Sequence, residues 1–364
     1  MPVLWTSFEY LLITFSSDGS AGSIAYSQTD FLPIIQIASI TGITGISFLL
    51  LLVPSAIALS VHFQQNRVPI KKILVCTSII IIISLTFGIL RLGKDYRAPL
   101  IKVGLACIDE AEHEETGMPK TEVEFRVAKL YSEKIDKLAS ERAKVIVLPE
   151  KILALNNTID SSVFRILQTS AIKNNVEIIG SYTRITNKIK ENAGLIISAE
   201  GKLNTSYVKV NLFEGERYNG FISGKEICLV DINEVNAGFA ICKDFDYQNF
   251  IRRYGKANVR IMFAPAWDFV QDGWLHSRMA VLRGVENGFP IVRCAREGRL
   301  TVSDPYGRIK FEASSENEKA VSLVAIVQPI KIKTLYSCIG DSFGIINLMA
   351  AIFLILLSLR KSSK

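Results

Sequence analysis

Residues 235–246 read VNAGFAICKDFD, and this stretch decides how the rest of the chain is interpreted. An apolar run of strand character ends at Cys242, and a polar turn follows that opens a helix through Tyr247, Phe250 and Tyr254. A strand-to-helix corner of this kind exposes a side chain at the carboxyl edge of a sheet, where open α/β sheets place ligands and chemistry. Cys242 is therefore a candidate nucleophile, although free cysteines are also among the residues most often buried in a core.

Two further stretches supply an acid and an amine. Residues 144–150 read KVIVLPE, a β-branched run that ends in Glu150, and residues 206–212 read SYVKVNL around Lys209. Alone, each has an ordinary explanation, since a glutamate at a strand end is usually solvated and a lysine in a strand usually protects an edge. Together with Cys242 they predict a thiol site, because a carboxylate accepts the thiol proton and an ammonium stabilises both thiolate and oxyanion.

These three stretches resemble the catalytic motifs of the nitrilase, or carbon-nitrogen hydrolase, superfamily. Within it they are most similar to the membrane-bound apolipoprotein N-acyltransferases. That branch is indicated by residues 207–209 (YVK) with Glu216 soon after, by Trp267, and by residues 274–280 (WLHSRMA). The resemblance covers nearly the whole chain. It implies an α/β fold of the nitrilase type, an α-β-β-α four-layer sandwich with flanking transmembrane helices.

The resemblance also implies roles for individual residues. Cys242 corresponds to the nucleophile, Glu150 to the general base and Lys209 to the electrostatic partner of the oxyanion. The backbone N–H of Lys243 corresponds to a second oxyanion donor, and Glu216 to a supporting carboxylate.

Other positions near the motifs differ from the family pattern or have an alternative interpretation. Asp244 stands where the acyltransferases carry glutamate, and Lys243 replaces an aromatic residue, which alters the expected environment of an acyl chain. Trp267 is predicted to line the pocket, with a core aromatic residue as the alternative. His276 is interpreted as a satisfied core histidine rather than a catalytic one.

Composition excludes several other classes of protein. Hydrophobic residues make up 49% of the 364 residues and cluster at the two ends of the chain. The net charge of +7 does not indicate nucleic-acid binding, because the basic residues form no long block and instead flank apolar segments. Six cysteines without CxxC or CxxH spacing and three histidines predict no metal site, and the chemistry requires no cofactor.

The apolar ends predict a membrane protein, since a bilayer is crossed by about 20 apolar residues. A soluble-core interpretation is disfavoured because basic residues bound these segments. The predicted organisation is a membrane region at 1–97 with spans at about 31–63 and 73–90 and a possible short one at 4–15, a catalytic domain at 98–330, and a transmembrane helix with a basic tail at 331–364.

Basic residues also predict the orientation. One group lies between the first two spans and another ends the chain: Arg67, Lys71 and Lys72, and Arg360, Lys361 and Lys364. By the positive-inside rule both groups face the cytoplasm, so the middle region faces the other side of a bacterial inner membrane. The acyltransferases have eight membrane helices with the hydrolase-like domain before the last, and the equivalents of the first several are expected to be missing from this N-terminally short sequence.

The middle region alternates between strand and helix patterns. Amphipathic helices are predicted at 122–142, 161–173 and 274–286, and strands at 102–108, 145–148, 206–210, 238–242 and 259–264, among others. Such alternation indicates helices packed on sheets.

Three functions are compatible with these observations. The first is transfer of a fatty acyl group from membrane phospholipid, through a Cys242 thioester, to the N-terminal amine of a lipoprotein. The second uses the same residues to hydrolyse a small amide or nitrile, with the helices as an anchor. The third is a catalytically silent membrane scaffold, which the presence of Glu150, Lys209 and Cys242 argues against.

Overall fold

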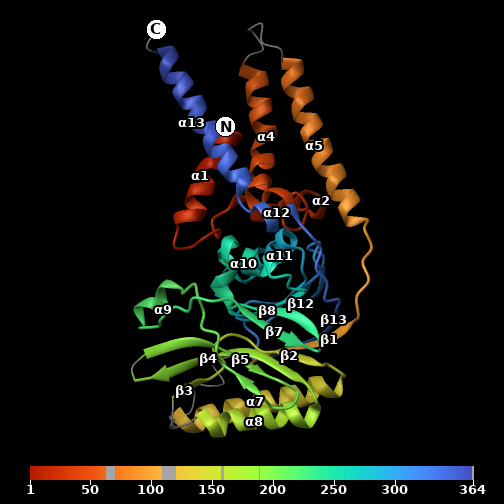
Figure 1. The fold of residues 1–364 in the computed structure, drawn as a ribbon, viewed down its shortest axis with the longest axis vertical. Coiled ribbons are helices and arrows are strands. Elements are labelled where there is room, and N and C mark those ends of the chain that lie inside the picture. The colour runs from red at the N-terminus through yellow and green to blue at the C-terminus, as the bar shows by residue number, and fades with distance from the viewer. Residues whose placement is uncertain (63–69, 109–119, 157–159, 188, 363–364) are drawn as a thin grey trace. The chain divides into compact units, whose positions relative to one another are not determined.

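The computed structural model describes residues 1–62, 70–108, 120–156, 160–187 and 189–362. Its contacts divide the chain into two compact units (Figure 1). The first consists of Met1–Tyr96, Val285–Gly288 and Ile332–Lys364, and the second of Arg97–Gly284 and Phe289–Lys331. Of the basic residues used to predict orientation, Arg67 and Lys364 lie outside the described residues.

The first unit is helical. Its helices are α1 (Pro2–Phe15), the 3-10 helix η1 (Ile24–Gln28), α2 (Leu32–Ile35), α3 (Ala38–Thr41), α4 (Ile43–His62), α5 (Ile70–Leu92), α12 (Leu335–Ile339) and α13 (Ser342–Ser362). Within the described ranges, three stretches are long and apolar enough to cross a membrane: Ile43–His62, Ile70–Leu92 and Ser342–Arg360. Helix α1 has 14 residues, which is short for a span.

The span predicted over 31–63 is not one helix. The chain breaks between α2 and α3, where the Gln36 side chain accepts a hydrogen bond from Arg91 of α5. It breaks again at Gly42, whose φ of 68° is left-handed and whose missing Cβ would lie 2.5 Å from the ring of Tyr336. A single long apolar run therefore becomes two short helices and one of membrane length, because a glycine and a polar side chain interrupt it.

The second unit contains two mixed sheets. In the described part of the chain, one sheet has seven strands in the order β13-β1-β2-β4-β5-β6, with β3 paired to β4. Its strands are β1 (Ile101–Ile108), β2 (Val145–Val147), β3 (Ala154–Asn156), β4 (Glu177–Thr186), β5 (Ile189–Ile197), β6 (Leu203–Asn204) and β13 (Ala320–Val327). Strands β1, β2 and β4 are mutually parallel.

The other sheet has six strands in the order β12-β11-β10-β9-β8-β7. These are β7 (Cys228–Ile232), β8 (Val235–Phe239), β9 (Ile261–Trp267), β10 (Ile291–Arg296), β11 (Arg299–Ser303) and β12 (Ile309–Ser314). Strands β8, β9 and β10 run parallel, so their carboxyl ends meet at one edge.

Successive side chains of a strand point to opposite faces of the sheet, so they pack into two different hydrophobic cores. Ile146 and Leu148 pack with helices α7 (Lys120–Ser140) and α8 (Asp160–Asn174), which lie side by side on the seven-stranded sheet (Figure 1). Val145 and Val147 belong instead to a core shared with the six-stranded sheet. That sheet's other face packs on α10 (Gln248–Lys256) and α11 (Gly273–Asn287).

Two predicted strands differ from the structure. Residues 206–210 form no strand. They pair with β5 through an isolated β-bridge between Val208 and Ala193. The strand predicted to reach Cys242 ends at Phe239, and a 3-10 helix, η2 (Cys242–Asp246), begins at the cysteine itself. Both motif residues thus lie in irregular backbone beside sheet edges, where a side chain is freer to point into a site.

Candidate active site

The motif residues Glu150 and Cys242 follow parallel strands of different sheets. Glu150 comes three residues after β2, and Cys242 three residues after β8. The backbone N–H of Glu150 donates to the carbonyl of Ala266 in β9, with an N–O distance of 3.2 Å. This hydrogen bond joins the two sheets at their carboxyl edges, the position at which α/β proteins build sites.

Cys242 occupies a strained backbone corner. Its φ is 45°, in the left-handed region that costs a non-glycine residue roughly 1–3 kcal/mol. The thiol is half-buried, and Sγ lies 3.6 Å from the carbonyl oxygen of Trp267. Neighbouring Lys243 extends toward Asp246, with Nζ 3.6 Å from Oδ2. Strain of this kind persists where surrounding structure over-determines the conformation, as it does at reactive residues.

Lys209 is held by its backbone on both sides. Its N–H donates to the carbonyl of Asn192 in β5, and its carbonyl accepts from the N–H of Gly224, both at 2.9 Å. The side chain is fully buried, and Nζ lies 2.8 Å from Oε1 of Glu150 and 2.9 Å from Oε2 of Glu216. The ammonium of Lys209 is therefore shared between two buried carboxylates that are distant from each other in the sequence.

Asn192 completes this cluster, and sequence reasoning missed it. Its Nδ2 donates to Oε1 of Glu150 at 2.6 Å and to Oε1 of Glu216 at 2.9 Å. Its Oδ1 accepts from the hydroxyl of Ser181 at 3.0 Å. Asn192 follows Lys190 and Glu191 in β5, so the local pattern gave no signal that this amide is buried and needs partners.

The buried charges control one another's ionisation. Burial by itself lowers the pKa of Lys209, but the charges of Glu150, Cys242 and Glu216 outweigh it and hold that pKa well above its usual value. Burial by itself raises the pKa of Glu216, but Lys209 and Lys151 outweigh it and lower that pKa to about 2. Lys209 is thus a fixed cation and Glu216 a fixed anion near neutral pH.

The Cys242 thiol, in contrast to the Glu216 carboxyl, has a raised pKa. Burial raises its pKa well above the usual value, and the negative charge of Glu150 adds to the effect, while Lys209 partly opposes it. The resting thiol is therefore protonated, and attack on a substrate requires a base to take the proton as the bond forms. Glu150 is the acid of the cluster whose charge acts most strongly on this sulfur.

Asp244 links the backbone before Cys242 to the segment that contains Lys209. Its carboxylate accepts from the Tyr207 hydroxyl at 2.6 Å, from the N–H of Asn211 at 2.8 Å and from the N–H of Ile241 at 3.0 Å. Burial raises the pKa of Asp244, and these donors oppose that rise. The carboxylate connects the residue before Cys242 with the segment after Lys209, so it sets the spacing of the two.

Trp267 lies between two cations at the end of β9. The Arg296 guanidinium lies 4.5 Å from its ring centroid, and Lys151 Nζ lies 5.1 Å away. Its indole N–H donates to Glu297 at 3.2 Å, and its carbonyl is the group next to the Cys242 thiol. The backbone of Trp267 therefore lies beside the sulfur, and its ring packs with the two cations.

His276 belongs to an ionic cluster rather than to the carboxylate–lysine cluster. Its Nδ1 lies 3.4 Å from both Asp268 and Asp272. Burial lowers its pKa, but the two aspartates outweigh burial and raise that pKa to about 10. A histidine that stays protonated at neutral pH is a poor proton acceptor, which suits a structural position.

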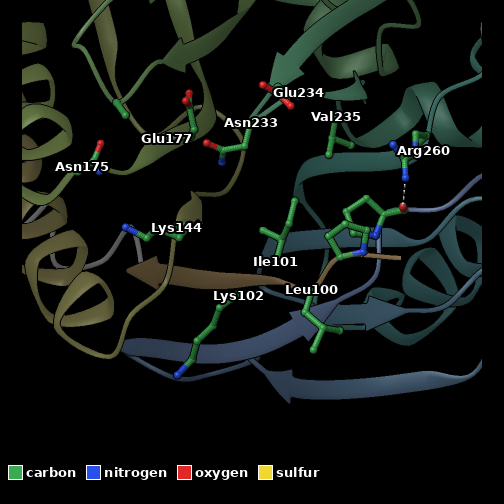
Figure 2. Close-up of a pocket in the computed structure, with 13 residues that line it drawn as sticks. Leu100, Ile101, Lys102, Lys144, Asn175, Glu177, Asn233, Glu234, Val235 and Arg260 are labelled. Carbon is green, nitrogen blue, oxygen red and sulfur yellow. Dashed lines mark hydrogen bonds between the residues drawn. The ribbon is translucent and has the colours of Figure 1, made fainter. Parts of the chain in front are cut away.

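A pocket of about 460 Å³ lies elsewhere on the second unit (Figure 2). Its walls include Ile101, Glu177 and Val235, the first residues of β1, β4 and β8, so it lies at the amino ends of these strands, whereas Glu150 and Cys242 follow the carboxyl ends of β2 and β8. Figure 2 shows that the side chains of Lys144 and Arg260 lie on different sides of the pocket and do not point toward each other. Arg260 donates to the carbonyl of Pro329 at 3.2 Å. The pocket contains none of the motif residues and is a separate feature.

Within the ranges that the structure describes, no group of three or more histidine, cysteine, aspartate or glutamate side chains is placed to hold a metal ion.

Comparison with known proteins identifies the fold family. The model of the carbon-nitrogen hydrolase family matches residues 123–330, more than half of the chain. The chain belongs to the carbon-nitrogen hydrolase family. A second model, the N-terminal domain of apolipoprotein N-acyltransferase, matches residues 1–56 of this carbon-nitrogen hydrolase.

Curated relatives of this family member are apolipoprotein N-acyltransferases. The enzyme of Geobacter metallireducens is 23% identical over 347 residues, which cover 85% of this chain and 64% of the relative. The enzyme of Haemophilus ducreyi is 26% identical over 339 residues, which cover 84% and 65%. The chain thus spans just under two thirds of the length of these relatives.

Solved structures confirm the predicted nitrilase-like α/β fold. An amidase from Nesterenkonia sp. superposes with a TM-score of 0.55 at 14% sequence identity, covering 69% of this chain and 97% of the amidase. At that identity the likeness concerns the fold of the carbon-nitrogen hydrolase unit alone.

Proposed function

We propose that the chain is a membrane-bound N-acyltransferase that moves a fatty acyl group from phospholipid to the N-terminal amine of a lipoprotein. The observation that carries this proposal is the buried ammonium of Lys209, 2.8 Å from Glu150 and within electrostatic range of a strained, half-buried Cys242. The relatives' names and the three apolar helices favour a lipid substrate over a soluble one.

The first half-reaction forms a thioester. Glu150 takes the proton of the Cys242 thiol while the sulfur attacks the ester carbonyl of the phospholipid. The negative oxygen of the tetrahedral intermediate is stabilised by the Lys209 ammonium and the backbone N–H of Lys243. The C–O bond then breaks, and Glu150 returns the proton to the leaving lysophospholipid hydroxyl.

The second half-reaction transfers the acyl group. The amine of the lipoprotein's N-terminal residue attacks the thioester carbonyl, and Glu150 accepts a proton from that nitrogen. The same two donors hold the oxyanion, the C–S bond breaks, and the proton on Glu150 restores the Cys242 thiol. Atoms and charges balance without a cofactor, and the cycle is ping-pong.

Glu216, Asp244 and Trp267 have supporting roles in this mechanism. Glu216 and Asn192 position Lys209 and Glu150 through the contacts already described, and Asp244 holds the cysteine corner. Trp267, whose carbonyl oxygen lies beside the sulfur, would line the substrate pocket with its ring in this proposal. The catalytic unit in this proposal is a four-layer α-β-β-α sandwich on the non-cytoplasmic side of a bacterial inner membrane, anchored by helices that flank it in sequence.

Mass spectrometry tests the proposal directly. The purified full chain is incubated with phosphatidylethanolamine in mixed micelles, and the Cys242 peptide is examined for a fatty-acyl mass increment. The adduct should form in the wild type and in Cys338→Ala, which removes an exposed cysteine of the first unit, and should be absent in Cys242→Ala. A Cys242 that remains unmodified under conditions where an authentic acyltransferase is acylated would refute the mechanism.

The acceptor decides between transfer and hydrolysis. Addition of a synthetic lipopeptide with a free, lipid-modified N-terminal cysteine should discharge the thioester and acylate the amine. If water discharges it, or if small amides yield ammonia while phospholipid forms no adduct, the chain is instead a membrane-anchored carbon-nitrogen hydrolase. A Cys242→Ala variant that supports normal growth of a deletion strain would indicate a silent scaffold.

A further inference from the structure

Lys151, the residue after Glu150, supplies a second, half-buried amine to the cluster. Its φ of 52° is left-handed, and its N–H donates to the Ser181 hydroxyl at 2.9 Å. The side chain is 19% exposed, and Nζ lies 3.3 Å from Oε1 of Glu216. The same ammonium lies 5.1 Å from the ring centroid of Trp267.

Together the four charges alternate in sign. Lys151 contacts Oε1 of Glu216, and Lys209 contacts Oε2 of the same carboxylate and then Oε1 of Glu150. Two ammonium groups thus face two carboxylates, and the cluster is neutral while the Cys242 thiol is protonated. A buried cluster of this kind is stable when its charges balance, because an unpaired buried ion costs several kcal/mol.

Without Lys151 the balance changes. Lys209 would face two carboxylates alone, and the Coulomb attraction of an uncompensated Glu216 would compete with Glu150 and with a developing oxyanion for the same ammonium. A lysine held between two strong anions is a weaker electrostatic partner for a third.

We propose that Lys151 is a positioning residue for the thiol chemistry: by pairing with Glu216 on the side away from Lys209, it keeps the Lys209 ammonium available to Glu150, the thiolate and the oxyanion. This inference rests on the proposed function, because it concerns the same site. Lys151 acts through Glu216 rather than on the reacting sulfur, which lies beside the Trp267 carbonyl.

The groups that face Glu216 define what the test measures. From the segment after β2 they are Lys151 and Glu150, from the segment after β6 Lys209, and from β5 the neutral amide of Asn192. On its own helix, α9 (Glu214–Tyr218), the charged residues Glu214 and Arg217 are exposed. Lys151 and Lys209 are therefore the two cations in hydrogen-bonding range of the carboxylate among the described residues.

The experiment compares Lys151→Gln, Lys151→Arg and a matched control, Lys190→Gln. Both lysines lie over the ring of Phe221. Nζ of Lys190 is 5.9 Å and Nζ of Lys151 is 5.6 Å from the ring centroid. Lys190→Gln thus removes an equal charge near the same ring without removing a contact to Glu216. The purified full chain in mild detergent is alkylated with iodoacetamide between pH 6 and pH 10, and the rate at Cys242 is read by peptide mass spectrometry, which separates it from the exposed Cys76 and Cys338.

Loss of Lys151 should displace the Cys242 pH–rate profile to higher pH by roughly 0.5 unit or more, because one positive charge has left the cluster that stabilises the thiolate. Lys151→Arg should restore the wild-type profile, and Lys190→Gln should leave it in place. In acylation by phospholipid, Lys151→Gln should lower kcat more than it raises KM. An unmoved profile in Lys151→Gln, or an equal displacement in Lys190→Gln, overturns the inference.

This outcome is separable from failure of the proposed function. If the wild type forms no acyl adduct, the acyltransferase mechanism fails, yet the alkylation profiles still report whether Lys151 controls the thiolate. If the adduct forms at equal rates in the wild type and Lys151→Gln, the function stands and the role of Lys151 is refuted. Thermal unfolding of each variant identifies a loss of folding, which would expose the Cys242 thiol and move its profile to lower pH, opposite to the expected displacement.

Discussion

The brace formed by Asp244 leads to a quantitative prediction about the stability of the second unit. Substitution of Asp244 by alanine removes the acceptor used by the Tyr207 hydroxyl, by the N–H of Ile241 and by Asn211. Asn211 is half-buried, so its donors can reach water. The Tyr207 hydroxyl and the Ile241 N–H are buried and would have no replacement among these contacts.

Each buried donor left without an acceptor costs about 1–3 kcal/mol, so Asp244→Ala should lower the free energy of unfolding by about 2–6 kcal/mol. Tyr207→Phe removes one hydrogen bond to a charged group while Asp244 keeps its other donors, and should cost about 1.5–3 kcal/mol. In the double variant the orphaned hydroxyl is absent. Its cost should therefore fall short of the sum of the single costs by about 2 kcal/mol or more.

Urea-induced unfolding of the full chain in mild detergent measures these differences, with intrinsic fluorescence and circular dichroism required to give coincident transitions. Tyr218→Phe is the matched control, since this tyrosine is 91% exposed, and it should change the free energy of unfolding by less than about 0.5 kcal/mol. Strict additivity of Asp244→Ala and Tyr207→Phe would refute the reasoning, because it would mean that the two groups do not depend on each other.

Three further predictions concern pH and packing. Burial raises the pKa of Asp246 from 3.8 to about 6, so the folded state holds this proton more tightly than the unfolded state, and its contribution to stability should fall by about 3 kcal/mol as pH rises from 4 to 7. The difference between the wild type and Asp246→Asn in urea unfolding at several pH values measures this, and a pH-independent difference would contradict it. His276, with a pKa raised from 6.5 to about 10, should contribute stability that is complete below pH 6.5 and lost as pH rises through 10; a wild-type protein and a His276→Gln variant with parallel stability curves up to pH 10.5 would exclude this. Gly238→Ala should destabilise the protein by about 1–3 kcal/mol and slow Cys242 alkylation, because the new Cβ would lie 2.2 Å from the sulfur of Met262, whereas an unchanged melting temperature would show that the strand relaxes easily.

Local patterns in the sequence predicted much of the architecture. The amphipathic period predicted α7 at 122–142, where the helix runs from Lys120 to Ser140, and the β-branched run predicted β2 at 145–148, where the strand is Val145–Val147. These elements depend on side-chain period and burial, which can be read from a short window. The roles of Glu150, Lys209 and Cys242 stay a prediction, although the first two lie in direct contact.

Other features escaped the local pattern. The apolar run over 31–63 did not reveal that the chain turns at Gly42. That turn depends on close packing against Tyr336, which is distant in the sequence. The strand pattern around Lys209 predicted a regular strand, yet Val208 forms a single bridge to β5. Packing between distant segments overrode local preference in both places.

The sequence by itself determined most of the strands, helices and apolar stretches, and which residue types stand at strand ends, because those properties follow from neighbouring residues. The tertiary structure alone decided that Asn192 and Lys151 join Lys209 and the two carboxylates, and that Asp244 spans from the cysteine corner to the lysine segment. The physical reason is that charge balance and hydrogen-bond satisfaction in a buried site are properties of the assembled group, and its members are brought together by sheet pairing rather than by spacing along the chain.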